Sequence, residues 1–98
     1  MREVVIANTV LGKLSELRTY LAVELKMSEK AAMSRTDRMR LFLKSLANTA
    51  DYPLCRFKKW RTLGYRCTVF EKDWVFAYET FDDGVIVRDM SNTALLAE

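Results

Sequence analysis

The sequence has no histidine, a single proline, three glycines and two cysteines in its 98 residues. Without histidine there is no Ser-His or Cys-His pair, and the commonest general base of enzymes is missing. The scarcity of proline and glycine argues against linkers and low-complexity segments. No apolar run approaches the length that spans a bilayer, so we expect no membrane partner.

The two cysteines do not indicate a metal site. Cys55 and Cys67 lack the spacing of zinc ligands, and no histidine can complete such a site. The first 17 residues contain Glu3 and Glu16 and no small-residue cleavage site, which is unlike a signal peptide. We therefore expect two reduced thiols, no metal and no cofactor, in a cytoplasmic protein.

The remaining composition is that of one compact domain. Half of the residues are apolar and 30% are charged, and 98 residues leave no room for a second core, so residues 1–98 form a single domain. The net charge of +3 is a modest surplus. It allows a nucleic-acid partner or an acidic protein partner and proves neither.

Hydrophobic periodicity predicts two helices in the first half of the chain. Asn8 or Thr9 can cap the first, which ends near Met27, and Ser28 can cap the second, over about residues 29–48. The predicted apolar stripes are Leu11, Leu14, Leu17, Leu21 and Leu25 in the first helix and Ala32, Met39, Phe42, Leu43 and Leu46 in the second. The short break between them predicts an antiparallel helical hairpin.

Four segments have strand patterns: 3–7, 63–70, 74–81 and 85–90. "DDG" at 82–84 is a hairpin signal, because glycine tolerates the positive φ of such turns. The order predicts an α+β fold, β-α-α-β-β-β, with the N-terminal strand and the helical hairpin packed on one face of a small antiparallel sheet. We expect the other face of the sheet to stay open.

A basic cluster precedes the second strand segment. Its members are Arg56, Lys58, Lys59, Arg61 and Arg66, with Phe57, Trp60 and Tyr65 between them. Cations contact phosphates and flat rings stack on bases, so the cluster is a candidate surface for RNA or another target. The alternative is a solvated loop whose aromatic rings turn into the core.

Two arginines lie within predicted strands. The two-residue period places Arg66 and Thr68 on one face and Cys67 on the other. Arg88 has Val87 before it, so we expect it either to reach solvent on the open face or to pair with Asp89 or a helix carboxylate. Glu79 and Asp89 are weak candidates for a general base.

The segment "LGYRCTVFEKDWVFAYETFDDGVIVRDM" (63–90), with the order of elements, resembles the RelE/ParE superfamily of toxins from bacterial toxin–antitoxin pairs. "VLGKLSELRTYLAVEL" (10–25) is similar to the first helix of that superfamily. The resemblance implies a small toxin and an antitoxin that wraps a helix or extended segment over its apolar and basic surface. RelE-like members cut messenger RNA on the ribosome with basic and tyrosine side chains on the open sheet face. ParE-like members bind DNA gyrase and lack that catalytic set.

The sequence departs from the ribonuclease pattern. Val75 stands where the superfamily has an arginine, and the basic residue expected after the last strand falls near Ala94 and Leu95. No tyrosine follows Tyr78 to fill the expected C-terminal position. Because the loss of one charge-stabilising group can cost roughly 10²–10³ in rate, we favour a toxin that binds a protein target such as gyrase.

Two alternatives remain open. One is a divergent ribosome-dependent mRNA endoribonuclease, with candidate catalytic residues Arg61, Arg66, Arg88 and Tyr78. The other is a non-toxic relative that acts as a binding module. The candidates for RNA or target binding are Arg56, Lys58, Lys59, Trp60, Arg61, Arg66 and Arg88. We also expect that Trp60, Trp74 and Phe76 do not all fit inside so small a domain, and that some form a patch covered by the antitoxin.

Overall fold

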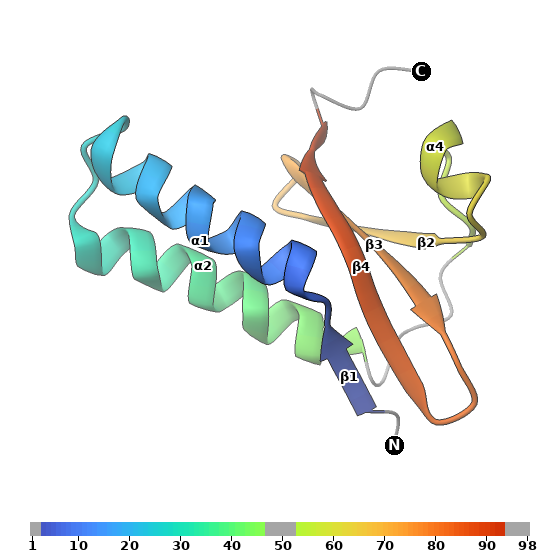
Figure 1. Cartoon of the computed structure of the whole chain (residues 1–98). Coiled ribbons are helices and arrows are strands. Elements are labelled where there is room, and N and C mark those ends of the chain that lie inside the picture. Colours follow the sequence, from blue (N-terminus) through green and yellow to red (C-terminus); the bar gives the residue numbers. More distant parts are fainter. Residues whose placement is uncertain (1–2, 47–52, 94–98) are drawn as a thin grey trace.

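The fold is a four-stranded mixed sheet with a helical hairpin on one face (Figure 1). The computed structural model describes residues 3–46 and 53–93. Its elements are β1 (Glu3–Ile6), α1 (Asn8–Val23), α2 (Glu29–Lys44), α4 (Lys58–Arg61), β2 (Arg66–Phe70), β3 (Trp74–Thr80) and β4 (Gly84–Asn92). The predicted α+β class is confirmed, with α4 as an unpredicted addition. No helix in the described ranges has both the length and the apolar character needed to cross a bilayer.

The sheet has the strand order β1-β4-β3-β2. β2, β3 and β4 are antiparallel, as predicted, but β1 runs parallel to β4, from the pair Glu3 and Gly84 to the pair Ile6 and Val87. The prediction of an antiparallel sheet is therefore wrong for β1. Its pairing joins the two ends of the described chain, and no turn sequence sets the relative direction of strands that are so far apart.

The buried face of α1 shares with the predicted leucine stripe only the three central positions of that stripe. It consists of Val10, Leu14, Leu17 and Leu21, whose spacings are four, three and four. Leu11 and Leu25, which we expected inside, are 38% and 54% exposed. The helix ends at Val23, before Met27, and its N-cap is Ala7, with no side-chain cap bond.

The start and the buried face of α2 agree with the prediction. The backbone N–H of Ala31 donates a hydrogen bond to Ser28 Oγ at 3.1 Å, so Ser28 is the N-cap. The buried residues from the predicted stripe are Ala32, Met39, Leu43 and Leu46. α2 ends at Lys44, earlier than predicted, and residues 47–52 lie outside the described part of the chain.

The helical hairpin packs on one face of the sheet, which we call the helical face. Phe76 and Tyr78 of β3 and Val85, Val87 and Met90 of β4 form its floor. The inward positions of β4 change from odd to even numbers because the register with β3 shifts after Val87. This irregularity is a β-bulge.

The hairpin between β3 and β4 is confirmed, but the reason for its glycine is different. The backbone N–H of Phe81 donates to the carbonyl of Gly84 at 2.8 Å. Gly84 is not among the residues with positive φ. A Cβ at this position would lie 3.2 Å from the carbonyl oxygen of Glu3, so glycine is needed for the close approach of β1.

Candidate functional site

Residues 53–65, which we call the lid, cover part of the sheet face opposite the helical hairpin (Figure 1). Phe57 and Trp60 of the lid form one buried cluster with Val75 and Ala77 of β3. We call this side of the sheet the lid face. Our prediction that it stays open is wrong over β3. The spacing of three between the two rings puts both on one side of the α4 turn, where the apolar strand residues can enclose them.

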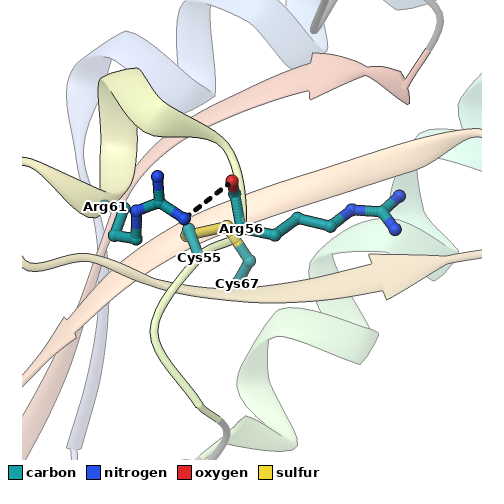
Figure 2. The surroundings of a disulfide bond; sticks show 4 residues. All are labelled: Cys55, Arg56, Arg61 and Cys67. Atoms are coloured by element: carbon teal, nitrogen blue, oxygen red, sulfur yellow. Dashed lines mark hydrogen bonds between the residues drawn. A yellow bond between two sulfur atoms is a disulfide. The ribbon is translucent and has the colours of Figure 1, made fainter. Parts of the chain in front are cut away.

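A disulfide between Cys55 and Cys67 joins the lid to β2 (Figure 2). The two Cα atoms are 4.9 Å apart, and the backbone N–H of Cys55 donates to the carbonyl of Tyr65 at 2.9 Å. The prediction of two reduced thiols is therefore wrong. The cysteines are 12 residues apart in the sequence, and only the return of the chain through the lid brings them together.

The outer side of the lid is basic. Its exposed cations, which we call the basic lid surface, are Arg56, Lys58, Lys59 and Arg61. Lys59 Nζ lies 5.3 Å from the centroid of the Trp60 ring, and Arg61 Nη1 donates to the carbonyl of Arg56 at 3.5 Å (Figure 2). The aromatic rings thus lie beneath the cations. This is the second of the two alternatives, in which the loop is solvated and its rings turn into the core.

Two of the predicted site residues are enclosed. Trp60 is 2% exposed beneath the lid, and Tyr78 is 0% exposed among the residues that the helical hairpin covers. A ring in either position cannot stack on a base or move a proton to a bound RNA while the fold is closed. The assignment of Trp60 to target binding and of Tyr78 to catalysis is therefore not supported by their positions.

Arg66 lies on the opposite side of the sheet from the lid. It pairs with Tyr78 across the β2–β3 ladder, and residues opposed in this way share a face. Thr68, two residues further along β2, is 6% exposed on the same face. The predicted alternation along β2 is thus confirmed, and it separates Arg66 from Arg61.

Arg88 belongs to the lid face and has a carboxylate partner. Its Nε donates to Glu79 Oε2 at 2.7 Å, and the two side chains are 38% and 30% exposed. We expected either a solvent-facing arginine or a pair with Asp89 or a helix. Asp89 instead accepts from Lys13 Nζ of α1 at 2.6 Å. Neither alternative is met as we stated it: Arg88 lies on the face that we expected to be open, and it is paired with a strand carboxylate that we did not name.

An apolar groove lies between α1 and the ends of β3 and β4, and we did not predict it from the sequence. Its volume is about 540 Å³. It is lined by Lys13, Glu16, Leu17, Tyr20, Trp74, Met90, Ser91 and Asn92. Tyr20 is 50% exposed and Trp74 is partly exposed, whereas Phe76 is enclosed. The feature of the sequence that could have indicated this groove is Tyr20, an aromatic residue next to Leu21 at the border of the buried stripe of α1.

The described residues contain no group of three or more His, Cys, Asp or Glu side chains that could hold a metal ion. Their charged features include the basic lid surface and ion pairs that involve the sheet and the helices. A scan against models of protein families and a search of curated proteins both find no match to this chain.

Proposed function

We propose that this protein is the toxin component of a type II toxin–antitoxin pair of the RelE/ParE kind, and that it acts by binding a protein target, such as DNA gyrase, in the manner of ParE-like members. The resemblance of residues 63–90 and the order of elements are the basis of the family proposal. The positions of the candidate catalytic residues favour the binding mechanism over cleavage of RNA.

The choice of target binding over RNA cleavage rests on the separation of the four candidate catalytic residues. Arg61 is on the lid, and Arg88 is on the lid face in an ion pair with Glu79. Arg66 is on the helical face, and Tyr78 is enclosed there. Phosphoryl chemistry requires charge-stabilising and proton-transferring groups within a few ångströms of one reacting atom. A set divided between two faces of a sheet does not meet this requirement.

Two surfaces have the chemistry that protein partners use. The lid combines its cations with two exposed leucines, Leu54 at 52% and Leu63 at 59%. The groove beside Tyr20 and Trp74 is mainly apolar. Aromatic residues and arginine are enriched at protein interfaces, where a stable complex buries roughly 1,200–2,000 Å². We assign the antitoxin to an apolar and basic surface of this kind.

The first experiment is expression of the chain alone in a bacterium. We expect growth arrest, and relief of the arrest by co-expression of a short, acidic, helix-rich protein encoded beside it. Normal growth with confirmed folded protein would instead support the non-toxic binding module. A purified complex of the two proteins would identify the antitoxin.

The second experiment separates binding from cleavage. In arrested cells, primer extension on messenger RNA should reveal no new codon-spaced ends, and purified protein at micromolar concentration should inhibit supercoiling by gyrase. Codon-spaced ends would establish the ribonuclease alternative. Arrest with neither effect would retain a protein-binding toxin and remove gyrase as its target.

A further inference from the structure

We propose that Cys55–Cys67 is a site of thiol–disulfide exchange, which a protein or small-molecule dithiol opens, and that its opening releases the lid from the sheet. This goes beyond the proposed function. The chemistry does not depend on toxicity, and only its setting in a reducing compartment rests on the expected cytoplasmic location. Disulfides in such compartments are usually transient and redox-sensing.

The two cysteine residues differ in exposure. Cys55 is 1% exposed beneath the lid, whereas Cys67 is only partly buried and belongs to β2, an edge strand of the sheet. The attack of an incoming thiolate therefore occurs at Cys67 Sγ. Cys55 Sγ leaves with the electron pair of the broken bond.

The exchange is balanced by the second thiol of the reductant. Cys55 takes up a proton, and the second thiolate then attacks the sulfur of the reductant in the mixed disulfide. Cys67 leaves as a thiolate and takes up a proton. The protein gains two electrons and two protons, and the dithiol is oxidised to a disulfide.

Apart from the disulfide, the contacts between the lid and the sheet include the cluster of Phe57 and Trp60 with β3 and a bridge from Leu54 to Arg66 of β2. α4 has only four residues, which is too short to be stable without tertiary contacts. Its cluster with the sheet is the smaller of two buried clusters and is separate from the one under the helical hairpin. Residues 52–70 contain no aspartate or glutamate, so the cations of the lid repel one another with no acidic residue in that stretch to offset them. Reduction therefore opens the lid and leaves the helical face intact.

Hydrogen exchange measured by mass spectrometry tests this inference on the full chain. The protein is compared in its oxidised form and after treatment with dithiothreitol, with free thiols counted by alkylation. We expect at least a tenfold faster exchange of the amides in residues 55–65 on reduction, and unchanged protection in α1, α2 and β4. Reoxidation should restore the original rates.

The double variant Cys55→Ala/Cys67→Ala is the matched control. Its lid should exchange as fast as that of the reduced protein and should not respond to dithiothreitol. Three outcomes would overturn the proposal: a disulfide that the dithiol does not reduce in the folded protein, equal lid protection in both forms, or loss of protection throughout the chain. The last would make the disulfide a support of the whole fold.

Discussion

At the scale of single residues, two glycines have different structural roles. Gly84 begins β4 beside β1, and a Cβ there would approach the carbonyl of Glu3 to 3.2 Å. Gly12 lies within α1, where a Cβ would meet no atom within 4 Å. A methyl group at Gly84 thus crowds the backbone of the paired strand β1, whereas at Gly12 it only restricts the unfolded chain and favours the helix.

We predict opposite effects on stability for the two alanine substitutions. Gly84→Ala should lower the free energy of unfolding by about 1–3 kcal/mol, as is typical of overpacking. Gly12→Ala should raise it by about 0.5–1 kcal/mol. Urea unfolding of the oxidised protein, followed by circular dichroism, measures both changes. An equal effect of the two substitutions would contradict the close approach of β1.

The side chains of the candidate site show what a sequence can predict at this scale. The alternation of Arg66, Cys67 and Thr68 followed from the geometry of a strand and is confirmed. The partner of Arg88 did not follow, because Glu79 reaches it across a bulged pair of strands, and such a register is a property of two strands together. The burial of Trp60 was one of two open alternatives, since a basic and aromatic segment has the same composition whether its rings face a ligand or a core.

At the scale of elements, the helices depend on local signals that a sequence displays. α2 begins at a residue with a side-chain cap, and α1 begins after Ala7 without one. Ser28 Oγ satisfies one of the first backbone N–H groups of α2, which otherwise lack a partner within the helix. The start of α2 should therefore be sensitive to this single hydroxyl.

We predict that Ser28→Ala lowers the free energy of unfolding by about 1 kcal/mol. Ser34→Ala is the control, because Ser34 is exposed within the same helix and alanine is the better helix former. The control should be neutral or slightly stabilising. Thermal unfolding of the two variants side by side measures the difference, and equal losses of stability would mean that the cap contributes nothing.

The accuracy of the element predictions follows the range of the interactions involved. The two helices and the three antiparallel strands were predicted from periodicity and turn residues, with errors of a few positions at their ends. The direction of β1 was not, because its parallel partner lies at the other end of the described chain. The lid was not predicted either, because a single turn of helix leaves little periodicity, and a disulfide between two isolated cysteines leaves none.

At the scale of the whole molecule, the sheet separates two surfaces of different composition. The helical hairpin covers one face, and the lid covers part of the other and presents the basic lid surface to solvent (Figure 1). Arg56, Lys59 and Arg61 are exposed here, and the stretch from 52 to 70 has no acidic residue. If the proposed toxin binds its target through this surface, the arrest of growth depends on where the positive charges lie as well as on the net charge of +3.

Two charge-reversal variants with the same net charge test this dependence. Lys59→Glu/Arg61→Glu changes the lid, and Lys30→Glu/Arg40→Glu changes exposed positions of α2. If the lid contacts the target, the lid variant should lose growth arrest. It should also remain folded, because opposite charges on the lid reduce the repulsion among its cations. The α2 variant should still arrest growth. Thermal unfolding confirms that both are folded, and equal toxicity of the two would show that the lid does not contact the target.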